Sequence, residues 1–302
     1  MKGFFLKPYR WALVISLILT GTFAFVLLDS FVIPKSFTVV ESQAAVKTEI
    51  SSQAQSAPIV NDNSYEDENI KITIETVHEY NSTIYIADVQ ITEASYLKTA
   101  LAGSTYGRNI KETTSEIAEV NNAIFAVNGD YYGFRSEGYV LRNGVLYRAA
   151  ARKVADDEAL VINEEGNFSI IHENQVSVES LHPESIRQIF SFGPALVEDG
   201  QITVDSGSEV SQSQKSNPRT AIGQVSALHY VIIVSDGRTS ESEGLSLLEL
   251  AREFKERGCA AAYNLDGGGS STMYFNGKVI NNPTDGRNAK EREVSDIVYI
   301  GY

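Results

Sequence analysis

In Ala123-Ile-Phe-Ala-Val-Asn-Gly-Asp130, an unbroken apolar run ends abruptly in polar residues and a glycine. Five consecutive apolar residues before a turn former indicate a strand that is buried on both faces. Tyr230-Val-Ile-Ile-Val234 has the same character and ends at Ser235-Asp236-Gly237-Arg238. These runs predict a domain that is dominated by sheet.

Shorter patterns around these runs complete the expected fold. Apolar residues alternate with polar ones over 70–75, which indicates a half-buried strand. Four dipeptides between apolar runs predict hairpin turns, namely Asn143-Gly144, Glu165-Gly166, Asp199-Gly200 and Asn276-Gly277. Ser246 and Glu249 form a capping-box pattern at the start of an amphipathic segment that Gly258 would end, and residues 113–120 are a weaker helix candidate. We therefore expect one α+β domain over 69–302, a sheet-dominated single domain with a few flanking helices.

The N-terminus has the pattern of a membrane anchor. Residues 11–28 contain no charge, and Lys2, Lys7 and Arg10 precede them. Eighteen helical residues extend about 27 Å, close to the thickness of a hydrocarbon core. The positive-inside rule then predicts that residues 1–33 form a cytoplasmic stub and transmembrane helix, a single pass in the cell membrane with the C-terminal domain extracellular. A cleaved signal peptide and a buried soluble helix are the alternatives.

Residues 34–68 contain no glycine and have no sustained apolar period. Their Ser, Gln, Glu and Asn content predicts a flexible polar tether, with a stalk helix as the alternative. Because the chain is acidic and anionic headgroups repel it, we expect this tether to let the domain stand off the bilayer.

Composition excludes several classes of protein. The formal net charge is −14 and basic runs are lacking, so nucleic acid is not an expected partner. One cysteine cannot form an internal disulfide, and the four scattered histidines do not pair at a metal-ligand spacing. We expect no cofactor and no metal, with calcium held by Asp and Asn oxygens as the alternative. The oligomeric state stays open.

Polar and glycine residues gather at five places, of which Asn264-Leu-Asp-Gly-Gly-Gly-Ser-Ser-Thr272 is the most unusual. Three consecutive glycines are an entropically costly choice for a mere turn. They suit a backbone that passes close to a ligand and turns its N–H groups toward an anion, with Ser270 and Ser271 adding hydroxyl donors. The run is neither a Walker loop nor a dinucleotide fingerprint.

The motifs in order resemble the phosphodiester glycosidase family, over about residues 90–302. They are Asn128-Gly129, Gly193-Pro194, Pro218-Arg-Thr-Ala-Ile-Gly223, Asp236-Gly237, Gly244-Leu-Ser-Leu-Leu-Glu-Leu-Ala251, Asn264-Leu-Asp-Gly-Gly-Gly-Ser-Ser271 and Arg292-Glu-Val294. Bacterial relatives are often called exopolysaccharide biosynthesis proteins. One departure is Asp130-Tyr131-Tyr132, where the family usually has Gly-Phe-Phe, and we expect it to alter the sugar pocket.

The resemblance implies cleavage of a sugar–O–phosphate linkage at the anomeric carbon. A phosphodiester needs cationic or N–H partners, and an oxocarbenium-like state needs a carboxylate. We expect Asp266 to be the main catalytic carboxylate, with Asp130, Glu137 and Asp236 as partners. The expected substrate-binding residues are Asn128, Gly129, Arg219, Thr220, Gly267, Gly268, Gly269, Ser270, Ser271 and Arg292.

The expected function is that of an extracytoplasmic hydrolase of the cell envelope that acts on sugar-1-phosphodiesters in surface or secreted glycans. A conventional glycoside hydrolase and a non-catalytic glycan-binding or exopolysaccharide assembly factor are the alternatives. In every case the expected partners are a carbohydrate or sugar-phosphate substrate and, through the N-terminal helix, a membrane.

Overall fold

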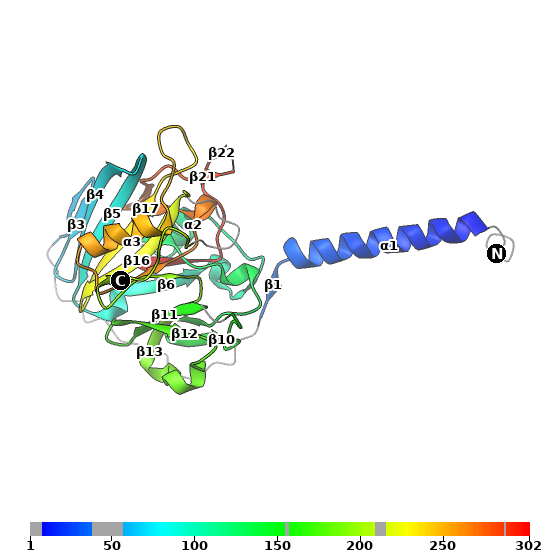
Figure 1. Ribbon diagram of the computed structural model, residues 1–302, viewed down its shortest axis with the longest axis horizontal. Helices are drawn as coiled ribbons and strands as arrows, with labels where there is room; N and C mark the ends of the chain where they lie inside the picture. The colour runs from blue at the N-terminus through cyan, green and yellow to red at the C-terminus, as the bar shows by residue number, and fades with distance from the viewer. Residues whose placement is uncertain (1–7, 38–56, 155–156, 209–215, 287) are drawn as a thin grey trace.

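A computed structural model of the protein describes residues 8–37, 57–154, 157–208, 216–286 and 288–302. Helix α1 (Pro8–Phe31) projects from a sheet-dominated domain as an isolated rod (Figure 1). Its segment Tyr9–Phe31 is long and apolar enough to cross a membrane, and none of it is buried against the domain.

Three antiparallel sheets build the domain. The nine-stranded sheet has the order β15 (Gln201–Ile202), β14 (Ala195–Glu198), β18 (Ala261–Asn264), β16 (Arg219–Ser226), β17 (His229–Ser235), β5 (Ser82–Ile91), β4 (Ile70–Glu79), β3 (Ser64–Glu66), β2 (Ile59–Asn61). The second sheet has the order β20 (Lys278–Val279), β19 (Met273–Phe275), β8 (Phe125–Asn128), β23 (Asp296–Ile300), β6 (Leu97–Leu101). The third has the order β10 (Val145–Arg148), β9 (Val140–Arg142), β13 (Ile186–Phe190), β11 (Glu158–Asn163), β12 (Phe168–His172). Two short ladders pair β1 (Lys35–Ser36) with β7 (Gly107–Arg108), and β21 (Thr284–Asp285) with β22 (Asn288–Ala289).

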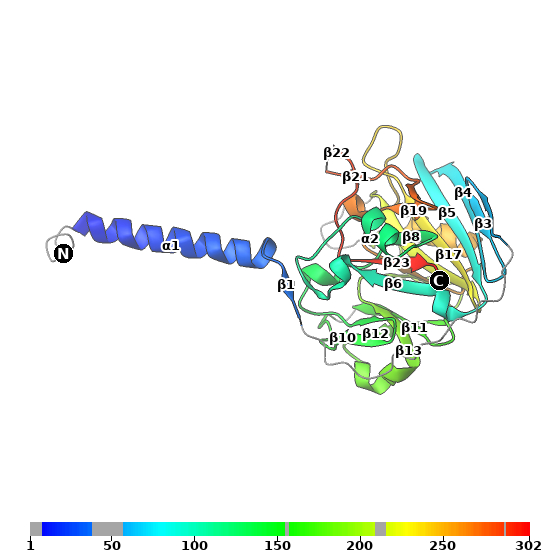
Figure 2. The ribbon, with the colours of Figure 1, turned by 180° about the vertical axis from the view of Figure 1, so that it is seen from behind.

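The sheets enclose one core, and two helices cover their outer faces. Alternation along β17 sends Ile232 and Val234 into the core between the sheets, and Val231 and Ile233 toward helix α3 (Leu247–Glu256). Helix α2 (Thr114–Val120) packs on the outer face of the second sheet, where Ala126 of β8 faces it. Figure 2 shows α2 in front of β8 and β23, on the side away from α3.

Local sequence signals predicted these elements correctly. Both helices begin with a capping box, at Thr113 and Ser246. The four predicted hairpin turns all join antiparallel strands, and at Asn143-Gly144 both residues have the positive φ that a tight hairpin requires. The prediction of an α+β fold that is dominated by sheet is confirmed.

The structure differs from the predicted tether at both of its ends. Lys35–Ser36, next to helix α1, forms strand β1 on the domain. At the other end β2 and β3 extend the large sheet, and Tyr65 of β3 is buried in the core. The sheet therefore begins about ten residues before the expected domain boundary. The centre of the predicted tether, 38–56, lies outside the described residues.

Candidate active site

Strand ends from two sheets meet at one place. β16 runs antiparallel to both β17 and β18, so the start of β16 lies beside the ends of its neighbours. Asn128, the last residue of β8 in the second sheet, joins this edge through its side chain. Its Nδ2 donates to the Asp266 carbonyl at 2.6 Å, and its Oδ1 accepts from Thr220 Oγ1 at 2.7 Å. The two sheets are thus connected directly beneath the glycine run.

Asp266 lies at the centre of this junction. Its Oδ1 accepts the Gly267 N–H at 2.9 Å, and its Oδ2 accepts Ser270 Oγ at 2.6 Å. Burial raises the pKa of Asp266, although the Ser270 hydrogen bond and the positive charge of Arg292 oppose the rise. A carboxylate with a pKa above the usual range is suited to accept a proton near neutral pH.

The glycine run passes directly beneath two guanidinium groups. A Cβ on Gly268, whose φ is +63°, would lie 2.6 Å from Arg238 Nη2. A Cβ on Gly269 would lie 2.6 Å from Arg292 Nη2. In the short helix η6 (Gly268–Ser270), the positive φ of Gly268 favours glycine, and a side chain at Gly269 would displace Arg292 and Asp285.

Arg238 and Arg292 form a cationic pair beside Asp266. Arg292 donates through Nε and Nη2 to Asp285 Oδ1, at 2.9 and 2.8 Å, and Arg238 donates to Asn217 Oδ1 at 3.2 and 3.1 Å. Burial, and then the like charge of Arg292, lower the pKa of Arg238. Both guanidinium groups are partly open to solvent, so they can meet an incoming anion.

Other predicted binding residues lie deeper and bond to protein groups. Arg219 is 2% exposed and donates through Nε to the Leu245 carbonyl at 2.9 Å. Thr220 and Asn128 are fully buried. Gly129 packs on Asp296, whose carboxylate occupies the place of a Cβ. These four residues support the floor of the site.

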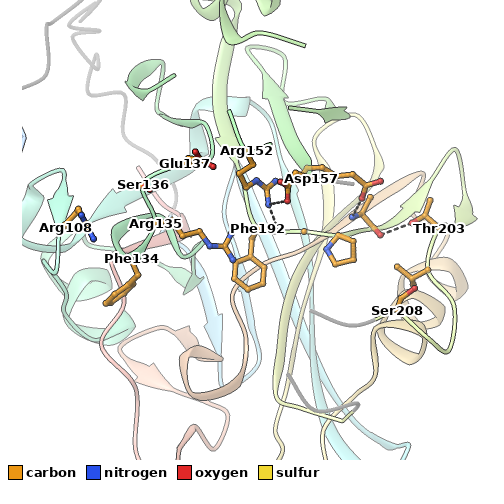
Figure 3. Close-up of a pocket in the computed structure, with 15 residues that line it drawn as sticks. Arg108, Phe134, Arg135, Ser136, Glu137, Arg152, Asp157, Phe192, Thr203 and Ser208 are labelled. Atoms are coloured by element: carbon orange, nitrogen blue, oxygen red, sulfur yellow. Dashed lines mark hydrogen bonds and ion pairs between the residues drawn. The ribbon is translucent and has the colours of Figure 1, made fainter. Parts of the chain in front are cut away.

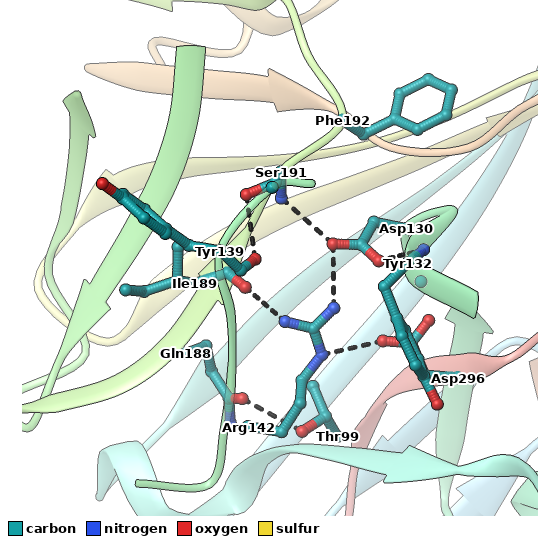
Figure 4. Close-up of polar contacts among 12 residues, drawn as sticks. Thr99, Asp130, Tyr132, Tyr139, Arg142, Gln188, Ile189, Ser191, Phe192 and Asp296 are labelled. Carbon is teal, nitrogen blue, oxygen red and sulfur yellow. Dashed lines mark hydrogen bonds and ion pairs between the residues drawn. The ribbon is translucent and has the colours of Figure 1, made fainter. Parts of the chain in front are cut away.

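Asp130 lies in an ion-pair network around Arg142 (Figure 4). Arg142 Nη2 lies 2.9 Å from Asp130 Oδ2, and its Nε donates to Asp296 Oδ2 at 2.8 Å. Burial favours the neutral acid, but Arg142 and the Ser191 N–H hold the pKa of Asp130 below its usual range. Burial raises the pKa of Asp296 to about 7, against the pull of Arg142. Asp130 therefore acts in this structure as a buried anchor for the segment that follows β8.

The other two predicted partner carboxylates also lie in networks of their own. Asp236 accepts the Asn282 N–H at 2.8 Å and the Tyr85 hydroxyl at 3.3 Å, and so holds the 281–282 loop. Glu137 pairs with Lys153 at 2.8 Å. The structure thus brings Asp266 together with the glycine run and Arg292, whereas Asp130, Asp236 and Glu137 bond to other partners.

Glu137 lines a cavity of about 890 Å³ next to this site (Figure 3). The Arg135 guanidinium lies 4.9 Å from the centre of the Phe192 ring in the cavity wall, and its positive charge opposes the rise in the pKa of Asp266. Arg108 lies at one end of the cavity, and Thr203 lies at the other (Figure 3).

Sequence reasoning missed Arg238, Arg135 and Asp285. Arg238 was visible as the residue after Asp236-Gly237, and its φ of 65° marks an unusual backbone. The other two have no local pattern. Among the described residues, no group of three or more His, Cys, Asp or Glu side chains is arranged to hold a metal ion.

Comparisons with known proteins identify the family of the chain. A sequence model of the family described as phosphodiester glycosidase matches residues 121–301. An uncharacterized SPbeta prophage-derived protein, YomE of Bacillus subtilis (strain 168), is 34% identical over 204 residues, which are 66% of this chain and 31% of that protein. Human N-acetylglucosamine-1-phosphodiester alpha-N-acetylglucosaminidase is 27% identical over 194 residues, 58% of this chain and 36% of the human protein. The chain thus spans about a third of the length of these relatives.

Solved structures show the same fold. The catalytic domain of zebrafish N-acetylglucosamine-1-phosphodiester alpha-N-acetylglucosaminidase superposes with a TM-score of 0.60 at 19% identity, over 77% of this chain and 83% of that one. A hypothetical protein from Synechocystis superposes with a TM-score of 0.54 at 15% identity, over 78% and 62% of the two chains. The family match covers more than half of the sequence, and this chain belongs to the phosphodiester glycosidase family.

Proposed function

We propose that this protein is a membrane-anchored, extracytoplasmic hydrolase that cleaves the bond between the anomeric carbon of a sugar and a phosphodiester oxygen in surface or secreted glycans. The observation that carries the proposal is the position of Arg238 and Arg292 above the glycine run, with the Asp266 carboxylate beside them.

The two arginines suit a phosphodiester. Each non-bridging oxygen of the phosphate can accept a charge-assisted hydrogen bond from one guanidinium, and two such bonds orient the group. Asp285 offsets part of the positive charge of the two arginines. The charge that remains matches a phosphodiester, which carries a single negative charge. The backbone of the glycine run adds no side chain that would keep the phosphate away.

The reaction needs one general base and little general-acid catalysis. Water adds to the anomeric carbon, and the bond from that carbon to the bridging oxygen breaks with both electrons leaving on the phosphate. A phosphomonoester leaves readily without a proton, because its conjugate acid is strong. Asp266 accepts one proton of the attacking water, and its raised pKa fits this task. The products are a free sugar and a phosphomonoester.

Helix α1 supports the proposed location. Its length and apolar sequence suit one membrane span, and the positive residues that precede it favour a cytoplasmic N-terminus. The catalytic domain then lies outside the cytoplasm, where surface and secreted glycans are its available substrates.

The test compares two kinds of substrate on the full-length protein in detergent. The first is the methyl diester of N-acetylglucosamine 1-phosphate, and the second is an aryl glycoside of the same sugar. We expect free sugar from the diester alone. Turnover of the aryl glycoside alone would indicate a conventional glycoside hydrolase, and binding without turnover would indicate a glycan-binding or exopolysaccharide assembly factor.

Variants of the arginines sharpen the test. Arg238→Gln and Arg292→Gln should each raise KM for the diester about tenfold or more, because each removes a charge-assisted hydrogen bond of about 1.5 to 3 kcal/mol. Arg252→Gln is the matched control, since Arg252 is exposed on α3. Equal KM values for all three variants would contradict the assignment of the phosphate site.

A further inference from the structure

The end of helix α1 is fixed to the catalytic domain. Lys35 pairs with Arg108, and Ser36 pairs with Gly107, in an antiparallel ladder that begins four residues after the helix ends. Asn109 Nδ2 donates to the Ser30 carbonyl at 3.3 Å and to the Ile33 carbonyl at 3.1 Å. We call this set of contacts, residues 30–36 with 107–109, the anchor clamp. It replaces the free linker that the sequence suggested at this point.

The anchor clamp lies close to the bilayer surface. The apolar segment of 23 residues extends about 34 Å, slightly more than the hydrocarbon core, so Phe31 lies near the core boundary. Residues 32–34 separate it from Lys35, and even fully extended they place the clamp within about 14 Å of that boundary. The headgroup layer is about 5 to 8 Å deep on each side. The clamp therefore lies within the headgroups or just above them.

Exposed apolar side chains at the same place agree with this depth. Phe31 is 73% exposed, Val32 is 61% exposed, and Phe37 beyond the ladder is 46% exposed. Three large apolar residues in water at one junction would be unfavourable, whereas the interface of a bilayer accommodates them. Figures 1 and 2 both show β1 between the helix and the domain, with the domain extending away from it.

One wall of the cavity belongs to the anchor clamp. Arg108, the partner of Lys35 in the ladder, lines the cavity, and its buried Nε has no hydrogen-bond partner. From Arg108 the cavity continues past Phe134 and Arg135 toward Phe192 (Figure 3). The cavity wall also includes Gly193, whose carbonyl accepts Asn264 Nδ2 at 2.8 Å, two residues before Asp266. The cavity therefore extends from the anchor clamp toward the segment that carries the catalytic carboxylate.

We propose that the substrate is a glycosyl phosphodiester whose phosphate is attached to a membrane lipid, and that the anchor clamp holds the cavity at the headgroup layer to receive it. This inference rests on the proposed function. The sugar reaches the Asp266 site, the phosphate meets the arginines, and the lipid chain leaves past Arg108 into the bilayer. A cavity that is fixed at this depth is always accessible to a lipid-linked substrate. On a free tether, the cavity would face the bilayer only in some orientations of the domain.

The test uses the full-length protein in nanodiscs of phosphatidylcholine. Two substrates carry the same sugar 1-phosphate, one as a soluble methyl diester and one as a polyprenyl diester in the same disc. A variant with twenty Gly/Ser residues inserted between Ile33 and Pro34 frees the domain, because such a segment spans about 25 Å on average. The same insertion between Asp62 and Asn63, in the exposed β2–β3 turn at the opposite edge of the large sheet from the cavity-lining strand β14, is the control.

We expect the insertion after Ile33 to lower the rate on the polyprenyl diester at least fivefold and to leave the rate on the methyl diester unchanged. The control insertion should change neither rate. Arg108→Gln should raise KM for the polyprenyl diester alone. If the methyl diester is cleaved and the insertion after Ile33 does not slow the lipid-linked reaction, the inference is overturned and the proposed function stands. If neither substrate is cleaved, both are overturned.

Discussion

Replacing Asp296 by Asn should change how the stability of the domain depends on pH. Asp296 and Asp130 are both buried against the single guanidinium of Arg142, which cannot fully balance two negative charges. Asp296 Oδ1 is buried without a hydrogen-bond partner, so Asp296 is the carboxylate whose charged form is destabilised. Asn keeps the shape of the side chain and removes the charge.

The pKa of Asp296 gives the sign and the size of the effect. Burial raises it from 3.8 to about 7, so between those pH values the native state holds a proton that the unfolded chain has lost. The free energy of unfolding then falls as pH rises, by about 1.4 kcal/mol per pH unit and by about 3 kcal/mol from pH 5 to pH 8. Asp130 has a lowered pKa, and so its own contribution changes below pH 4, outside this range.

The assay is urea unfolding of the full-length protein in detergent at pH 5 and pH 8, followed by the near-ultraviolet circular dichroism of the tyrosines. The wild type should lose stability between the two values, whereas Asp296→Asn should lose about 3 kcal/mol less. Asp62→Asn, at an exposed position, is the control for general effects of charge. Parallel losses in the wild type and Asp296→Asn would refute the reasoning.

Three further predictions concern the site itself. Ser270→Ala removes the hydrogen bond that lowers the pKa of Asp266, so the acid limb of the pH profile of kcat/KM should move to higher pH; an unmoved limb would exclude Asp266 as the base. Arg219→Ala should reduce the free energy of unfolding by about 2 kcal/mol in urea titrations, because the buried Leu245 carbonyl loses the charged one of its two donors and keeps only the Asn217 N–H. Unchanged stability with lost activity would instead indicate that Arg219 binds substrate. Gly269→Ala should raise KM for the diester while thermal unfolding stays the same, because its Cβ displaces only the ends of the Arg292 and Asp285 side chains, which are partly open to solvent; a lower melting temperature would contradict this.

Local patterns predicted most of the secondary structure. The Asn143-Gly144 and Asn276-Gly277 turns and the two capping boxes depend on hydrogen bonds between residues a few positions apart, so a short stretch of sequence is enough to specify them. The tether prediction was less successful at its ends. Lys35–Ser36 becomes a strand only because residues 107–108, about seventy positions away, offer it an edge.

The candidate site likewise combines residues that local sequence predicted with residues that only the tertiary structure brings together. Asp266 and the glycines were predicted from one unusual run, and their proximity to Arg292 was expected from the family resemblance. Asp130 and Asp236 also follow apolar strands in the sequence, but in the described fold Asp130 pairs with Arg142 and Asp236 bonds to the 281–282 loop. Arg238 enters the site because β17 ends beside the start of β16, a register that its own neighbours in the sequence do not encode.

Local sequence was enough to predict helices α2 and α3, the hairpin turns, the apolar helix that precedes the domain, and a run of glycines as a candidate site. Tertiary structure decided which of several similar acids stays open to chemistry and which is neutralised, as well as where the domain stands relative to helix α1. The physical reason is that turns and caps are satisfied within a few residues. The state of a carboxylate depends on how far it is removed from water and on which cation the sheets bring to it.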